Sequence, residues 1–119
     1  MNKKILNYWR GIFGEYYAML YLLLHGYKIL KRRYKTKFGE IDIIGSKADN
    51  LIAFEVKTRN FKNEKIEEAF NQYQFYRISN ALKFFLNKNE YYSKFTLRID
   101  AILIYNKFKI KHIKNVWFE

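Results

Sequence analysis

Residues 51–58 read LIAFEVKT, an apolar run that carries an acid, Glu55, and a base, Lys57, two positions apart. The run is apolar enough to form a central strand of a sheet. Side chains two positions apart on a strand share one face, so Glu55 and Lys57 point the same way. Ionised groups are costly to bury unless they are paired or bind a metal. The plainer interpretation is an ion pair that faces solvent.

The strand predicted over residues 40–44 has the same feature, because Glu40 and Asp42 alternate with Ile41 and Ile43. Asp42 therefore points to a polar face. Residues 45–50 have turn character and predict a hairpin with residues 51–58. Asp42 and Glu55 can then lie side by side across the strand pair. Two carboxylates that close repel each other unless a cation lies between them.

A third acid lies in the helix predicted over residues 7–25, which Gly26 would close in a left-handed cap. Steps of three or four residues from Glu15 reach Gly11, Ala18 and Met19, so Glu15 shares a largely apolar face. Residues 16–24 are hydrophobic almost all round. Periodicity therefore leaves the buried face of this helix open, and a single exposed Glu15 is the alternative.

The remaining elements extend outward from these strands. A first strand is predicted over residues 27–36, a second helix over residues 65–86, and two final strands over residues 95–105 and 108–114. In the second helix the apolar residues recur at helical spacing, namely Phe75, Ile78, Leu82 and Phe85. The order α-β-β-β-α-β-β predicts an α/β fold with a mixed sheet whose first three strands form an antiparallel meander. We expect one domain over residues 1–119.

Composition limits the chemistry. The net charge is +12 with a pI near 9.8, which favours a polyanionic partner. Richness in Lys, Asn, Ile, Tyr and Phe with no Pro also indicates compositional bias, which weakens that inference. The absence of Cys excludes disulfides and thiolate metal sites, and His25 and His112 show no metal-ligand spacing. Any metal would be held mainly by oxygen.

No membrane span is expected. The longest apolar run, residues 16–24, is well short of the roughly 20 residues that cross a bilayer. Residues 1–4 resemble the basic end of a signal peptide, but Arg10 and Glu15 interrupt the apolar stretch after them and no small-residue cleavage site appears. The cytoplasm is the expected location.

Three carboxylates with a lysine suit phosphodiester hydrolysis. Mg²⁺ prefers oxygen ligands and binds through one or two carboxylates together with phosphate oxygens. A bound metal lowers the pKa of water and neutralises phosphate charge. Lys57 could orient the attacking water or stabilise developing negative charge. Glu15, Asp42, Glu55 and Lys57 are therefore the candidate catalytic residues.

The stretches Gly39-Glu40-Ile41-Asp42 and Glu55-Val56-Lys57-Thr58-Arg59 resemble the YraN family of small bacterial proteins. The spacing from Asp42 to Glu55 and Lys57 also resembles the PD-(D/E)XK nuclease pattern. The resemblance implies a restriction-endonuclease-like fold, similar to that of archaeal Holliday-junction resolvases. It implies a site for Mg²⁺, with Mn²⁺ as a substitute, at Glu15, Asp42 and Glu55, with the backbone carbonyl of Val56 as a further ligand.

Two residues depart from the family pattern. Arg33 stands where an asparagine is usual, and Gln74 stands where the second helix commonly carries a lysine. Neither change touches the acidic set, but both could alter how a nucleic-acid backbone is held. Because a glutamine on this helix also occurs in related nuclease families, Gln74 is an auxiliary site candidate.

Basic residues crowd the first strand just before the acidic motif. This ridge could hold phosphates beside the metal site, whereas the alternative is an edge strand that charge protects from aggregation. The candidate nucleic-acid contacts are Arg32, Arg33, Lys35, Lys37, Arg59 and Gln74. Lys62 and Lys65 are expected on solvated faces, and Arg98 with Asp100 is equally well explained as a structural ion pair.

These features predict a metal-dependent DNA endonuclease, with branched or flapped DNA favoured by analogy with resolvases. The alternative is a non-catalytic nucleic-acid-binding or adaptor module that keeps the nuclease fold. The presence of Asp42, Glu55 and Lys57 together argues against decay of a former site. Resolvase-like folds commonly dimerise, so a homodimer is also expected, although no residue in the sequence marks its interface.

Overall fold

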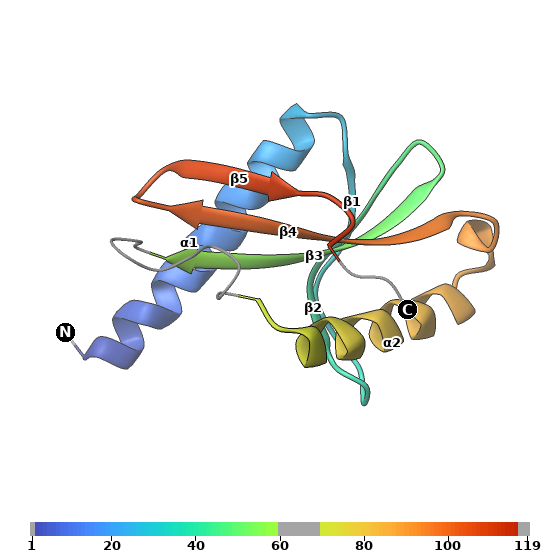
Figure 1. Cartoon of the computed structure of the whole chain (residues 1–119), viewed down its shortest axis with the longest axis horizontal. Coiled ribbons are helices and arrows are strands. Elements are labelled where there is room, and N and C mark those ends of the chain that lie inside the picture. The colour runs from blue at the N-terminus through green and yellow to red at the C-terminus, as the bar shows by residue number, and fades with distance from the viewer. Residues whose placement is uncertain (1, 60–69, 117–119) are drawn as a thin grey trace.

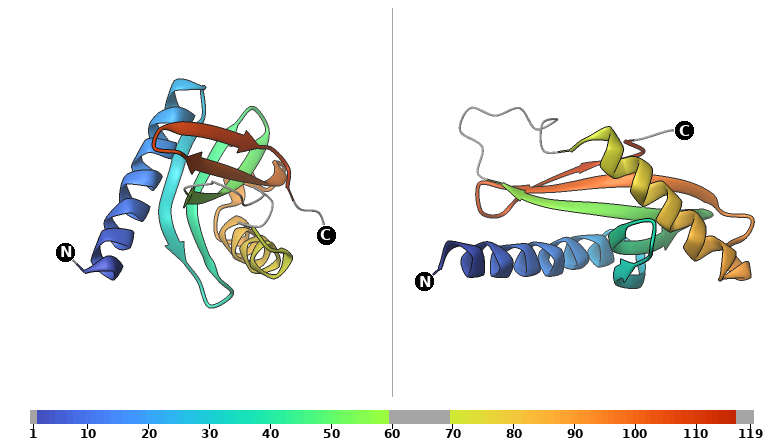
Figure 2. Two further views of the ribbon diagram at one scale, coloured as in Figure 1. Left: turned by 60° about the vertical axis from the view of Figure 1, so that its left-hand side comes forward. Right: turned by 90° about the horizontal axis from the view of Figure 1, so that it is seen from below.

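The protein is described by a computed structural model that covers residues 2–59 and 70–116. Two helices lie on opposite sides of a twisted sheet (Figures 1 and 2). The elements in chain order are α1 (Lys3–Leu24), β1 (Lys28–Lys35), β2 (Glu40–Lys47), β3 (Asn50–Arg59), α2 (Gln72–Asn87), the short 3₁₀ helix η2 (Glu90–Tyr92), β4 (Thr96–Tyr105) and β5 (Lys109–Ile113).

The five strands form one mixed sheet in the order β1-β2-β3-β4-β5. The pairs β1–β2, β2–β3 and β4–β5 are antiparallel, and β3–β4 is parallel. Parallel neighbours need a long crossover, and the segment that contains α2 supplies it. The predicted α-β-β-β-α-β-β order, the antiparallel meander and the mixed sheet are confirmed, and this architecture is consistent with a restriction-endonuclease-like fold.

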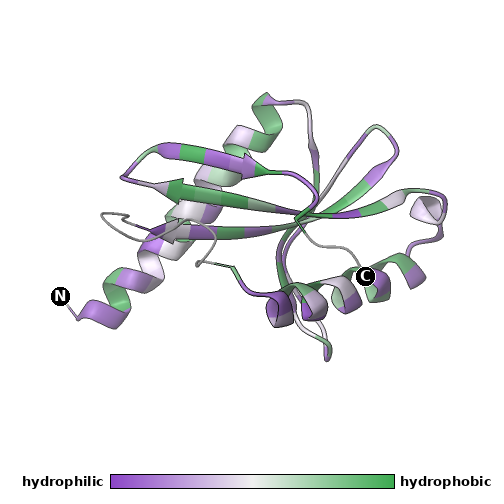
Figure 3. Cartoon of the chain, viewed as in Figure 1, coloured by the Kyte–Doolittle hydropathy of each residue, from purple (hydrophilic) through white to green (hydrophobic). Residues whose placement is uncertain are grey.

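The two faces of the sheet carry separate hydrophobic cores. Under α2 the predicted helix face is buried, with Phe75, Ile78, Leu82 and Phe85 at 6% exposure or less. Figure 3 shows hydrophobic residues along β4 and hydrophobic residues alternating with polar ones along α2. The other core lies under α1 and includes Ala18, Leu22, Ile52, Phe54 and Ile102.

Helix α1 packs closely against the sheet at its buried glycine and alanine positions. Gly14, Ala18 and Leu22 are its buried positions. A Cβ added at Gly14 would overlap the Thr58 hydroxyl of β3, so a glycine is what allows this close approach. The packing settles which face of α1 is buried, a question that its periodicity left open. It also holds Glu15, the next residue, close to β3.

Several element boundaries differ from those predicted. Helix α1 begins at Lys3 because the side chain of Asn2 caps it, accepting a hydrogen bond from the Lys4 amide at 2.7 Å. Gly26 closes it with φ +85°, as predicted. Strand β2 continues to Lys47, so the hairpin turn is shorter than residues 45–50.

Helix α2 begins at Gln72 after the N-cap residue Asn71. The Asn71 side chain accepts a hydrogen bond from the backbone N–H of Gln74 at 2.7 Å. Residues 65–69 of the helix predicted over 65–86, together with Lys62 and Lys65, lie outside the described residues. None of the helices within residues 2–59 and 70–116 combines the length and apolar character that a bilayer crossing needs.

Candidate active site

The candidate site lies where the pairing of β2 with β3 stops. That ladder runs from Lys47–Asn50 to Ile43–Phe54 and goes no further. Beyond it β3 pairs only with β4, while β2 pairs only with β1. Asp42 and Glu55 are the next residues on each strand. They therefore lie side by side at the opening between two strands, in agreement with the register expected from the sequence.

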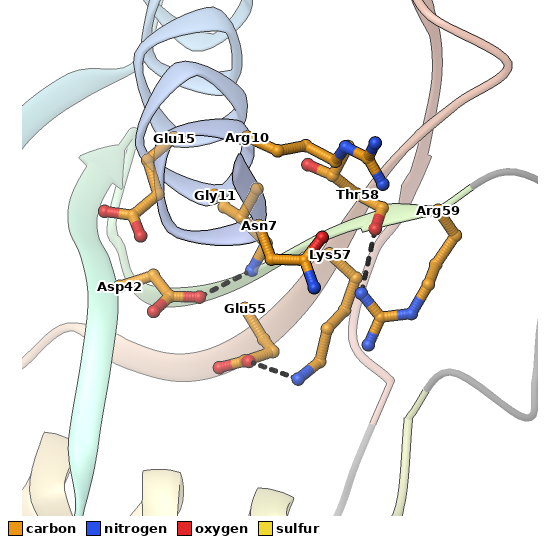
Figure 4. Close-up of a pocket in the computed structure, with 10 residues that line it drawn as sticks. Asn7, Arg10, Gly11, Glu15, Asp42, Glu55, Lys57, Thr58 and Arg59 are labelled. Carbon is orange, nitrogen blue, oxygen red and sulfur yellow. Dashed lines mark hydrogen bonds and ion pairs between the residues drawn. The ribbon is translucent and has the colours of Figure 1, made fainter. Parts of the chain in front are cut away.

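Asp42 takes the place of a missing backbone partner. The Val56 amide donates to the Asp42 carboxylate at 2.9 Å, where a continued ladder would have offered a backbone carbonyl (Figure 4). Because the N–H and C=O of one strand residue point to the same side, the Val56 carbonyl also faces this opening. Two carboxylates and one backbone carbonyl thus border the same gap.

Glu55 is held from two directions and is almost fully buried, at 5% exposure. Its Oε1 lies 3.3 Å from the Lys57 Nζ and accepts a hydrogen bond from the side-chain amide of Gln74 (Nε2) at 2.8 Å. The side chain of Lys57 is 21% exposed. Glu55 and Lys57 therefore share a face as expected, but they form a largely buried pair at the edge of a pocket instead of an ion pair in open solvent.

Glu15 reaches the site from α1 and is paired with a base. Its Oε1 accepts from the Arg33 Nε at 3.0 Å, and its side chain is 15% exposed. In Figure 4 its carboxylate hangs above Asp42. Within residues 2–59 and 70–116 no three acidic or histidine side chains are grouped closely enough to hold one metal ion. Glu15 thus stands apart from the Asp42–Glu55 pair, bound to Arg33.

Burial dominates the electrostatics of the two central acids. It raises the pKa of Asp42 to about 6, with a further increase from the nearby Glu15 charge and a decrease from the Val56 hydrogen bond. It raises the pKa of Glu55 to about 7, with the Asp42 charge adding to the increase and Lys57 opposing it. The surrounding donors do not compensate for the burial of two adjacent carboxylates, whereas a divalent cation between them would.

The residues present fit a hard divalent cation. Asp42, Glu55 and the Val56 carbonyl offer the oxygen ligands that Mg²⁺ and Mn²⁺ prefer, and the adjoining open pocket of about 470 Å³ leaves room for water and phosphate. The pocket is lined by Asn7, Arg10, Gly11, Glu15, Asp42, Glu55, Val56, Lys57, Thr58 and Arg59.

The candidate nucleic-acid residues divide into two groups. Arg59 lines the pocket, Gln74 holds Glu55 and Arg33 holds Glu15. The structure therefore brings these three to the acidic pair. The other three are Arg32, Lys35 and Lys37. They are exposed on β1 and just after it, and they do not line the pocket. Arg32 stacks over the Tyr16 ring at 4.4 Å.

Sequence reasoning missed three polar residues of the pocket, Asn7, Arg10 and Thr58. A signal for Asn7 was available, because steps of four residues from Glu15 reach Gly11 and then Asn7 on one helix face. Thr58 lies directly after Lys57 in the acidic strand. Arg10 has no such signal, since its position at the pocket follows from how α1 lies on the sheet.

The chain is similar to proteins from widely separated bacteria. It is 38% identical over 104 residues to UPF0102 protein Atu0303 of Agrobacterium fabrum, covering 87% of this chain and 84% of that protein. It is also 38% identical over 108 residues to UPF0102 protein THEYE_A1950 of Thermodesulfovibrio yellowstonii, covering 88% and 92% of the two chains.

A family model matches residues 14–104, a span that contains Glu15, Asp42, Glu55 and Lys57. Its description is "Uncharacterised protein family UPF0102". The match covers well over half of the chain, and the relatives align over most of their own length. The chain therefore belongs to the UPF0102 family, which is the YraN family that its motifs resemble.

Proposed function

We propose that the protein is a metal-dependent endonuclease that hydrolyses phosphodiester bonds in DNA. The observation that carries the proposal is that a half-buried Asp42 and a buried Glu55 lie side by side at a break in the sheet, with Lys57 3.3 Å from Glu55. Such a set is costly for the fold and useful for phosphate chemistry.

A bound Mg²⁺ would supply an activated water and a positive charge for the scissile phosphate. Asp42 and Glu55 would hold the ion, together with the Val56 carbonyl. Gln74 keeps the Glu55 carboxylate in place by donating to its Oε1 at 2.8 Å. The Asp42 carboxylate is oriented by the Val56 amide. Both ligands are thus positioned by hydrogen bonds before any ion arrives.

Lys57 is the group best placed to act on the reacting phosphate. Its ammonium lies beside Glu55 and lines the same pocket, so it can donate to the attacking water or to a phosphate oxygen that gains charge in the transition state. Arg10 and Arg59, which also line the pocket, would contact flanking phosphates. DNA is the proposed substrate because the chain carries a net charge of +12.

The test is a cleavage assay on linear, single-stranded, flapped and four-way DNA with Mg²⁺ or Mn²⁺, beside a chelator control. Asp42→Asn, Glu55→Gln and Lys57→Ala should each lower the rate by about 100-fold or more. Asp49→Asn is the matched control, because it removes a charge from an exposed residue of the turn between β2 and β3, outside the pocket. Equal residual activity in the three site variants would indicate a contaminating nuclease and contradict the proposal.

One observation favours a second candidate function. Arg33 pairs with Glu15, so among the described residues of the site Asp42 and Glu55 remain as the carboxylates that could hold an ion. A non-catalytic DNA-binding or adaptor module would tolerate this arrangement. Arg33→Asn separates the two functions, because it frees Glu15 for the ion. Tighter Mn²⁺ binding and faster cleavage by this variant would support the nuclease, whereas DNA binding without cleavage by parent and variant would support the adaptor.

A further inference from the structure

Helix α1 leaves a row of large apolar side chains exposed on the side that faces away from the sheet. The positions buried against the sheet are Gly14, Ala18 and Leu22. On the opposite side of the helix six large side chains are 48% to 67% exposed, namely Leu6, Trp9, Phe13, Tyr16, Leu20 and Leu23. Figure 2 shows α1 along the outside of the molecule. An amphipathic surface helix normally turns its apolar side chains toward the core and its polar side chains toward solvent.

The spacing of these six residues is that of a helix–helix seam. They follow one another at intervals of three, four, three, four and three residues. This heptad pattern drifts by about 20° per seven residues on a straight helix, which is what a left-handed pair of helices requires. A lipid surface would impose no such spacing. The pattern therefore indicates another helix as the occupant.

We propose that the exposed face of α1 is a dimer interface, on which the α1 helix of a second copy of this chain packs antiparallel. The six side chains expose on the order of 600 Å² and Ile5 and Leu24 extend the patch, against roughly 800 Å² per partner in a stable interface. A two-fold axis between Phe13 and Tyr16 makes the surface self-complementary. The proposal does not depend on nuclease activity.

Charge sets the antiparallel direction. The basic residues of α1 lie in its N-terminal half, at Lys3, Lys4 and Arg10, while residues 16–24 carry no charge. Parallel pairing would bring these cations and the positive ends of both helix dipoles together. Antiparallel pairing places each basic end beside the C-terminal half of the other helix, whose own residues carry no charge and where Arg32 of β1 is the neighbouring cation, stacked on Tyr16. It pairs Trp9 with Leu20, and Leu6 with Leu23, of the second copy.

Sedimentation velocity over a concentration series tests the dimer in the full chain. The parent should dimerise, and Phe13→Glu and Leu20→Glu should each raise the dissociation constant by at least about thirtyfold. Both side chains are exposed, so circular dichroism should remain unchanged. Tyr73→Glu is the matched control, since Tyr73 is a 71% exposed aromatic residue on α2. A parent that stays monomeric, or that binds anionic vesicles as a monomer, would overturn the proposal.

Disulfide cross-linking tests the direction, because the chain has no cysteine of its own. Mixed Phe13→Cys and Tyr16→Cys proteins should form a disulfide-linked dimer on mild oxidation. Leu20→Cys alone should not, because antiparallel helices separate the two copies of position 20 by about 16 Å along the axis. Efficient cross-linking of Leu20→Cys alone would overturn the antiparallel arrangement.

Discussion

The sheet carries two acidic sites, Asp100 on β4 and the Asp42–Glu55 pair on β2 and β3. They differ in how far hydrogen bonds and ion pairs compensate the negative charge. Asp100 in β4 is fully buried and receives four hydrogen bonds. The Arg98 guanidinium donates twice at 2.9 and 3.0 Å, the His112 ring lies 2.8 Å away and the Asn115 amide donates at 2.9 Å. Although burial acts to raise it, these partners hold the pKa of Asp100 below its usual value.

Asp42 and Glu55 together have three polar contacts, from Val56, Lys57 and Gln74, whereas Asp100 alone has four. Their pKa values are raised, first by burial and then by repulsion from neighbouring acids. The contrast separates structural from functional acids. A carboxylate whose charge the protein itself satisfies holds elements together, here β4, β5 and the segment after it. Two carboxylates left short of positive charge beside a pocket fit the cation site proposed above.

The largest effect expected from this comparison is on stability. Asp100→Asn should lower the free energy of unfolding by about 3 kcal/mol, because it leaves the largely buried guanidinium of Arg98 without its anionic partner. Urea denaturation with and without Mn²⁺ measures it. Asp49→Asn, an exposed acid in the β2–β3 turn, is the control. A loss no greater than that of the control would show that Asp100 does not have the structural role assigned to it.

The opposite result is expected at the proposed metal site. In chelator, Asp42→Asn should melt at or above the temperature of the parent, because it relieves repulsion of Glu55 while the asparagine oxygen still accepts from the Val56 amide. With Mn²⁺ at a hundred times its dissociation constant, the parent alone should gain about 2.7 kcal/mol. Thermal melts with and without metal decide. A marked drop for Asp42→Asn in chelator would mean a structural ion-pair network.

The two clusters should also respond oppositely to pH. The raised pKa values of Asp42 and Glu55 favour the protonated folded state, so their contribution is full below about pH 4 and is lost as pH rises through about 6 to 7. Asp100 contributes above its unfolded pKa and loses that contribution in acid. Melting in chelator should fall by roughly 5 °C from pH 5 to pH 8. The Asp42→Asn, Glu55→Gln double variant should lack this decline.

The smallest effect concerns the exposed basic residues of β1, which lie outside the pocket. Arg32→Glu with Lys35→Glu should lower DNA affinity on the order of threefold at 0.15 M salt and reduce its salt dependence, since both side chains are exposed outside the pocket. Asp42→Asn should leave DNA binding in place. Fluorescence anisotropy across salt concentrations measures both. Binding that ignores ionic strength would count against phosphate contacts.

Local sequence patterns were sufficient for much of the fold and for the centre of the candidate site. The buried face of α2, the β2–β3 hairpin and the facing of Asp42 and Glu55 all follow from periods of two or 3.6 residues and from turn residues. Such signals need only neighbours in the chain. The charge alternation in residues 40–44 and 51–58 was visible because it interrupts apolar strands.

Tertiary packing decided what those periods leave open. The hydrophobic residues around α1 do not reveal its buried face, which depends on how closely Gly14 approaches Thr58. The Arg33–Glu15 pair joins residues 18 positions apart, and the His112–Asp100 contact joins residues on neighbouring strands. The exposed apolar side of α1 likewise became visible only once the opposite side of the helix lay against the sheet. These contacts depend on which surfaces meet in three dimensions, and the spacing of residues along the chain does not specify that.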